Sequence, residues 1–103
     1  MLVRIVRMYF EPNKTKAFLD VFKSAHKQIE SFDGCFKVDL LHDHSNPNVF
    51  TTLSLWKDHQ SLESYRNSEL FKATWSKTKP LFIQKPVAQS YHIHTKGKTI
   101  EGV

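Results

Sequence analysis

Side chains able to recognise an aromatic ligand are concentrated between positions 56 and 75, as Trp56, Tyr65, Ser68, Phe71 and Trp75. A tyrosine hydroxyl can hydrogen-bond a ligand oxygen, and an indole can stack on a ligand ring. Aromatic residues at helical spacing nevertheless belong to a protein core more often than to a ligand site. Tyr65 and Trp75 therefore keep two interpretations, ligand contact and core packing, whereas Trp56 is expected to pack against the helix that follows it.

The two arginines of the first apolar segment, Arg4 and Arg7, point to opposite faces of a strand because their positions differ by an odd number, three. Arg4 shares a face with Val6, where a guanidinium group needs a carboxylate partner or an anionic ligand group. A carboxylate partner is the favoured interpretation, because buried charges are normally paired. Arg7 would point to the other face, where Asp39 or Glu11 of a second copy could pair with it.

Several common site chemistries have no motif in this sequence. There is no Gly-x-Ser-x-Gly motif, and Cys35 has no obvious base beside it, so nucleophilic hydrolysis is not expected. With only three glycines the chain has no phosphate-binding loop, and no cofactor is expected. His26 lies at the margin of an apolar helical stripe and is the nearest candidate for a general base. The catalytic residues are otherwise unknown.

Hydropathy patterning predicts four strands. Three are expected at residues 2–10, 36–42 and 87–94, where successive side chains alternate between two faces. The other is expected at residues 49–56, which are dense in β-branched and aromatic side chains. The stretch 43–48 is rich in His, Ser, Asn and Pro and predicts a hairpin loop. The second and third strands are therefore antiparallel neighbours.

Two helical regions separate these strands. The first follows Pro12 and Asn13, has apolar residues at a period near 3.6, and runs to about Ser31. The second divides into a short helix capped by Asp58 and a following helix capped by Ser68. Pro80 would end or kink that last helix.

The order β-α-β-β-α-β matches the ferredoxin-like plan, an α+β fold whose single antiparallel sheet carries both helical regions on one face. We expect one domain over residues 1–95 and a tail over 96–103. The first strand is apolar on both faces, so the face away from the helices needs a cover. A symmetric homodimer with facing sheets is the expected cover, with an interface that includes Val3, Ile5, Arg7 and Tyr9.

The histidines give weak support for a metal site. His92 and His94 alternate along one strand, and His42 and His44 flank Asp43, a spacing that metal sites can use. In a ferredoxin-like sheet the second and fourth strands occupy opposite edges, so only dimer packing could bring His42 near His92. We expect solvent-exposed histidines and no metal.

Composition limits the remaining possibilities. A chain of 103 residues fits one domain with one core. The net charge of +5 comes from scattered lysines rather than a stripe, so nucleic-acid binding is not expected. No apolar run approaches the roughly 20 residues of a membrane helix, and two arginines interrupt the first apolar stretch, which excludes a signal peptide. The single cysteine cannot form an internal disulfide, and the cytoplasm is the expected compartment.

Taken in order, these features resemble the dimeric α+β-barrel proteins of the antibiotic-biosynthesis monooxygenase (ABM) superfamily over about the first 94 positions. The resemblance rests on Arg7 and Phe10, the Phe32-Asp33-Gly34-Cys35 turn, Asn46-Pro47, Trp56, and the series Tyr65, Ser68 and Phe71. It implies a homodimer whose subunits each hold a pocket between helices and sheet for a flat aromatic or quinone-like molecule. The residues expected to line that pocket are Val6, Phe22, Tyr65, Phe71 and Trp75.

The haem-degrading branch of that superfamily has an Asn, a Trp and a His at its haem site. The matching positions here hold Val6, Tyr65 and Trp75. Haem iron needs an axial donor, and without the His there is none at that site, so haem degradation is not expected. The quinol-oxidising branch often carries a His where this chain has Tyr65.

Three functions remain open. The first is a cofactor-independent monooxygenase acting on a small aromatic or quinol, with Tyr65 orienting the substrate oxygen and Trp75 and Phe22 walling the ring. The second is a non-catalytic dimeric ligand-binding or stress-response module that uses the same pocket. The third is an isomerase or lyase, which requires two proton-transfer groups facing one cavity. A titratable group beside Tyr65 would favour an enzyme, and an entirely apolar surrounding would favour binding.

Overall fold

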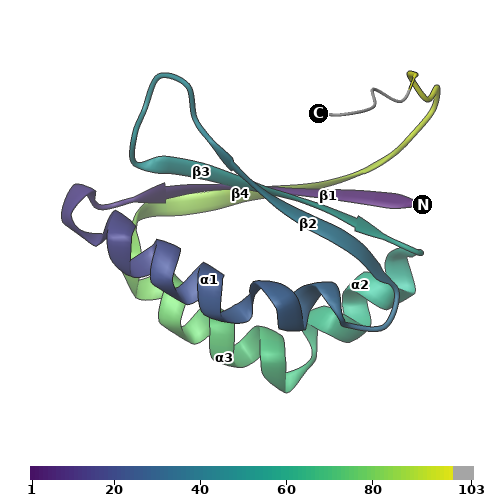
Figure 1. The fold of residues 1–103 in the computed structure, drawn as a ribbon, viewed down its shortest axis with the longest axis horizontal. Helices are drawn as coiled ribbons and strands as arrows, with labels where there is room; N and C mark the ends of the chain where they lie inside the picture. The colour runs from purple at the N-terminus through teal and green to yellow at the C-terminus, as the bar shows by residue number, and fades with distance from the viewer. Residues whose placement is uncertain (99–103) are drawn as a thin grey trace.

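The computed structural model describes residues 1–98, which form one four-stranded antiparallel sheet with helices on one of its faces (Figure 1). The elements in chain order are β1 (Leu2–Phe10), α1 (Thr15–Glu30), β2 (Cys35–His42), β3 (Val49–Trp56), α2 (His59–Arg66), α3 (Glu69–Thr78) and β4 (Phe82–His92). Single 3-10 turns at Pro12–Lys14 and Lys79–Leu81 precede α1 and follow α3. The expected tail falls partly on residues 99–103, which lie outside the described residues.

The strand order β2-β3-β1-β4 confirms the ferredoxin-like α+β fold. β1 is central and pairs antiparallel with β3 and β4, and β2 pairs antiparallel with β3 across the predicted hairpin. β2 and β4 are therefore the two edges, as expected for the strands that carry the histidines.

Side-chain caps start the two helices of the second helical region. The Asp58 carboxylate accepts a hydrogen bond from the Ser61 backbone N–H at 2.8 Å, and the Ser68 hydroxyl accepts one from the Phe71 N–H at 3.1 Å. Both bonds satisfy N–H groups that have no partner inside the helix. Pro80 lies in the 3-10 turn after α3, so it ends the helix rather than kinking it.

The last strand differs from the expected range of 87–94. β4 begins at Phe82, five residues earlier, and ends at His92. Its register against β1 shifts between Arg7 and Tyr9, where Lys85 and Pro86 together oppose one residue of β1. A bulge on an edge strand accommodates a proline that has no N–H to donate. Because a proline usually interrupts a strand, Pro86 kept residues 82–86 from being predicted as part of β4.

The core fills the space between the sheet and the helices. Phe10 is 1% exposed and stacks on Phe18 of α1 with ring centroids 4.1 Å apart. Trp56 is also 1% exposed and packs against Leu62 and Tyr65 of α2, which confirms its expected packing role. These contacts hold α1 and α2 at fixed distances from the sheet.

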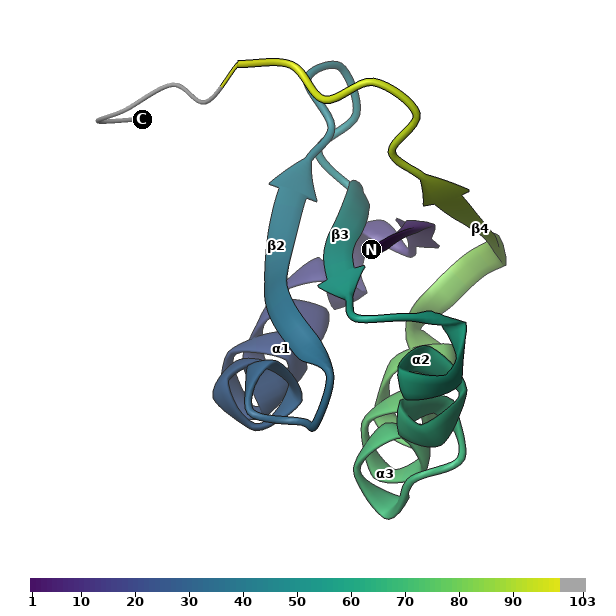
Figure 2. The ribbon, with the colours of Figure 1, turned by 90° about the vertical axis from the view of Figure 1, so that its right-hand side faces the viewer.

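The other face of the sheet has no helix over it among residues 1–98 (Figure 2). The register places Val3 of β1 between Leu55 of β3 and Tyr91 of β4 on this open face, and Tyr91 is 48% exposed. Arg7 also lies on this face, where its expected partner is Asp39 or Glu11 of a second copy. Within the chain it pairs with Asp43, the first residue after β2, at 3.1 Å.

None of the described helices is long and apolar enough to cross a membrane.

Candidate functional site

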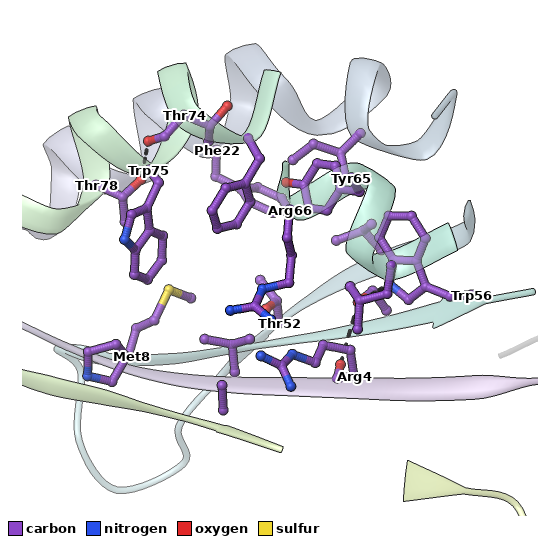
Figure 3. Close-up of a pocket in the computed structure, with 18 of the residues that line it drawn as sticks. Arg4, Met8, Phe22, Thr52, Trp56, Tyr65, Arg66, Thr74, Trp75 and Thr78 are labelled. Carbon is purple, nitrogen blue, oxygen red and sulfur yellow. Dashed lines mark hydrogen bonds between the residues drawn. The ribbon is translucent and has the colours of Figure 1, made fainter. Parts of the chain in front are cut away.

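A cavity of about 300 Å³ lies between the helices and the sheet (Figure 3). Side chains from all four strands and all three helices line it. The structure places all of the residues expected from the resemblance in this lining, namely Val6, Phe22, Tyr65, Phe71 and Trp75. Its volume is at the lower end of the range for small-molecule sites, roughly 300 to 1,000 Å³.

Aromatic rings form one continuous wall of the cavity. Trp56 stacks on Tyr65 at 5.1 Å between centroids, Tyr65 meets Phe71 edge to face at 5.3 Å, and Phe71 stacks on Trp75 at 5.7 Å. Trp75 then meets Phe82 of β4 edge to face at 5.5 Å. Each ring is positioned by its neighbours, so the wall presents a preformed apolar surface to a flat ligand.

Tyr65 belongs both to the core and to the cavity lining. Its ring packs in the core against Trp56 and Phe32, while the residue also lines the cavity. Figure 3 shows its hydroxyl turned toward the cavity. Burial raises the pKa of Tyr65 well above its usual value, so the group stays a neutral phenol that can donate a hydrogen bond.

Arg4 reaches the cavity from β1 without the carboxylate partner that its burial led us to expect. Its guanidinium donates to the Ser90 hydroxyl of β4 at 3.0 Å, and no carboxylate of residues 1–98 lies within ion-pair distance of it. Partial burial lowers the pKa of Arg4, and the nearby positive charge of Arg66 lowers it further. The expected carboxylate pair is therefore wrong within residues 1–98, because Glu63, the nearby carboxylate, pairs with Arg66 instead.

Arg66 also lines the cavity, and the sequence interpretation missed it. It ends α2 and pairs with Glu63 at 3.0 Å, while its side chain stays 45% exposed. A basic residue in the last turn of a helix is explained by the helix dipole alone, so it attracted no notice. The available signal was its position four residues after Leu62, since residues four apart share a helix face and Leu62 is buried.

His26 lies outside the cavity lining. Its Nε2 atom lies 2.7 Å from the Val38 carbonyl oxygen, which can only accept, so Nε2 donates. The Glu30 carboxylate accepts from the Val38 N–H at 2.9 Å. These two α1 side chains satisfy both outward backbone groups of one residue on the edge strand β2, which gives His26 a structural role.

No carboxylate, imidazole or thiol belongs to the cavity lining in the described part of the chain. Burial, with the nearby charge of Glu30, raises the pKa of the Cys35 thiol to about 11, which leaves it protonated and unreactive. His42 stacks on Phe50 at 4.3 Å, and the described residues contain no group of three metal-ligating side chains. The site therefore combines aromatic and aliphatic walls with the Tyr65 phenol, two guanidinium groups and the hydroxyls of Thr52, Ser54, Thr74 and Thr78.

A single antiparallel sheet with helices on one face and an aromatic-lined cavity between them defines a small α+β protein of the ferredoxin-like class. This chain belongs to the antibiotic biosynthesis monooxygenase family, whose sequence model matches residues 1–76.

Solved structures share the fold over nearly the whole chain. A protein from Nitrosomonas europaea, described as a "putative antibiotic biosynthesis monooxygenase", has 18% identity and a TM-score of 0.86, with 92% of this chain and 100% of that chain covered. A conserved protein from Methanosarcina mazei Go1 has 24% identity and a TM-score of 0.83, covering 88% and 91%. A further protein with the monooxygenase description, from Caulobacter crescentus CB15, has 20% identity and a TM-score of 0.83, covering 87% and 86%. A search of curated proteins finds no match.

Proposed function

We propose that this protein is a homodimeric, cofactor-independent monooxygenase of the cytoplasm that oxidises a small electron-rich phenol or quinol. The observation that carries the proposal is the aromatic cavity of about 300 Å³, toward which the Tyr65 hydroxyl is turned. Such a volume accommodates a molecule of one to two fused rings. Family membership supports the reaction class.

The chemistry needs no external reductant when the substrate supplies every electron. A phenol with a hydrogen on its para carbon reacts with O₂ to give a quinone and water. One oxygen atom enters the ring, the other leaves as water with the two hydrogens lost by the phenol. The phenolate form passes the first electron to O₂, and the resulting radical pair combines at the ring carbon. An apolar cavity favours these steps because it keeps water from the intermediates.

The residues divide this work by position. Trp75 and Phe22 come from facing helices and hold the substrate ring between them. Tyr65 donates its hydroxyl proton to a substrate oxygen as a hydrogen bond and thereby fixes which ring carbon faces the oxygen. His26 plays no part, because its ring is engaged with the backbone of β2.

The open face of the sheet supports a homodimer. Val3, Leu53 and Leu55 lie on that face with Val87 and Tyr91, the last two about half exposed, and no described helix covers them. A second copy presenting the same face would bury them in a closed two-fold interface.

A non-catalytic binding module is the second candidate, and one observation favours it. The cavity lining, as far as the structure describes it, lacks the carboxylate or imidazole that most proton-transfer enzymes use. The same observation weakens an isomerase or lyase more severely, because that chemistry needs two such groups. A monooxygenase that binds its substrate already ionised needs none.

A thermal-shift experiment tests the site. A two-ring phenol such as 2-naphthol, at 100 times its dissociation constant, is expected to stabilise the wild type by about 2.7 kcal/mol. Trp75→Ala removes one wall of the cavity and should abolish the shift at the same concentration. His26→Ala is the matched control, since it also alters a ring beside Phe22 but outside the lining, and it should keep the shift. An equal shift in wild type and Trp75→Ala would place the ligand elsewhere.

A further inference from the structure

Two guanidinium groups reach a cavity whose other lining residues are apolar or carry neutral hydroxyl groups. Arg4 projects from β1 and Arg66 from α2, and Figure 3 shows both groups in the space between the helices and the sheet. Both groups are partly exposed, and each like charge still disfavours the other unless a negative charge compensates them. A negatively charged group placed beside both arginines would therefore be stabilised.

The charges around this end of the cavity do not balance. Glu63 is the one carboxylate that pairs with either arginine within residues 1–98, and it is bound to Arg66 at 3.0 Å. His59 lies 4.0 Å from the same carboxylate, on the first turn of α2. Within the same residues, Arg4 hydrogen-bonds the neutral Ser90 hydroxyl and forms no ion pair. Two guanidinium groups facing one carboxylate leave a single positive charge at the open end of the cavity.

We propose that Arg4 and Arg66 form an oxyanion subsite, and that the pocket selects aromatic compounds carrying one negatively charged oxygen group. This inference rests on the proposed function, which it deepens by naming the charge state of the substrate. The guanidinium fork of Arg4 keeps unused donors after its bond to Ser90, and Arg66 remains partly exposed beside it. The aromatic wall receives the rings while the charged oxygen faces the two arginines.

The subsite explains how a substrate hydroxyl could ionise in a cavity without a general base. When a substrate hydroxyl ionises, its O–H bond breaks, the electron pair stays on oxygen and the proton passes to water at the open end. The two arginines stabilise the resulting anion, so no general base has to take the proton. The negative charge of Glu63 repels the substrate anion, and this repulsion is reduced because Glu63 is paired with Arg66. Tyr65 stays neutral and adds a hydrogen bond to the same oxygen.

Two probes of equal shape separate charge recognition from ring binding. Naphthalene-2-carboxylate and naphthalene-2-carboxamide have the same rings and nearly the same polar group, but only the first is an anion. Calorimetric titration of the wild type should give about tenfold or greater preference for the carboxylate, as expected for hydrogen bonds to a charged group. In Arg4→Gln, Arg66→Gln and the double variant, the preference should shrink stepwise to near one, with carboxamide affinity retained.

A control variant addresses the positive charge of the protein as a whole. Lys23→Gln with Lys27→Gln removes the same amount of charge from exposed positions of α1. This variant should keep the full preference for the carboxylate. Loss of the preference in the control to the same extent as in the arginine variants would overturn the subsite, because it would show a general field effect.

The ionised hydroxyl is tested with 2-naphthol, whose absorbance changes on ionisation. Bound to the wild type it should ionise at a pH lower by about one unit than in water, and in the double arginine variant it should not. Equal affinity for the carboxylate and the carboxamide would overturn the subsite while leaving the pocket and the proposed function intact. Failure of all three probes to bind would overturn both.

Discussion

Replacing Val3 by glutamate is expected to turn the proposed homodimer into a monomer. Val3 lies on the open face of the sheet between Leu55 and Tyr91, where facing sheets would bury it. A carboxylate buried there without a partner would weaken association by more than about a hundredfold. Sedimentation over a range of protein concentrations measures the change directly, and circular dichroism confirms that the variant still folds.

The matched control for the dimer is Ala17→Glu, which adds the same charge to an exposed position of α1 on the other side of the sheet. This variant should sediment as the wild type does. A wild type that stays monomeric at every concentration would refute the dimer, and so would a Val3→Glu variant with an unchanged dimer fraction. In that case the open face would need a different partner.

Replacing Gly34 by alanine is expected to destabilise the protein by about 2 to 4 kcal/mol. Gly34 has a φ of +86°, in the left-handed region that other residues rarely adopt, and an added Cβ would lie 2.5 Å from the Ser61 Cβ. The Gly34 carbonyl also accepts a hydrogen bond from the Lys57 N–H at 2.7 Å, so the turn cannot move away easily. Urea denaturation of the two proteins measures the difference.

A second substitution separates the two causes of that loss. Ser61→Gly removes both atoms that the new Cβ would meet, so Gly34→Ala in that background should cost only the backbone term, about 1 to 2 kcal/mol. An equal cost in both backgrounds would show that the contact with α2 is unimportant. The result bears on function as well, because this contact seats the helix that carries Tyr65 and Arg66.

Features encoded in local sequence could be predicted well. Asp58 and Ser68 were recognisable as caps because short polar side chains before a helical pattern have few other uses. The turn at Gly34 was also predicted, and the two-residue period of a strand separated the β1 residues of one sheet face from those of the other. The aromatic residues of the lining followed from the family resemblance, because spacing alone does not separate a ligand site from a core.

The arginine partners could not be predicted, because they depend on distances between elements rather than on patterns within one element. Arg7 forms an ion pair with Asp43 of the hairpin loop, and Arg4 donates a hydrogen bond to Ser90 on the neighbouring strand. The bulge at Pro86 was hidden for the same reason, since an edge strand tolerates a proline that a central strand would not.

Oxygen uptake with a defined phenol tests the central claim most directly. We would incubate metal-free and flavin-free protein with 1,5-dihydroxynaphthalene under ¹⁸O₂ and follow the product by mass spectrometry. The proposed function predicts 5-hydroxy-1,4-naphthoquinone carrying one labelled atom, with one O₂ consumed per quinone and a rate that falls to the protein-free background in Trp75→Ala. Binding of the phenol with no oxygen uptake above that background would contradict monooxygenase activity on such phenols and favour a binding module.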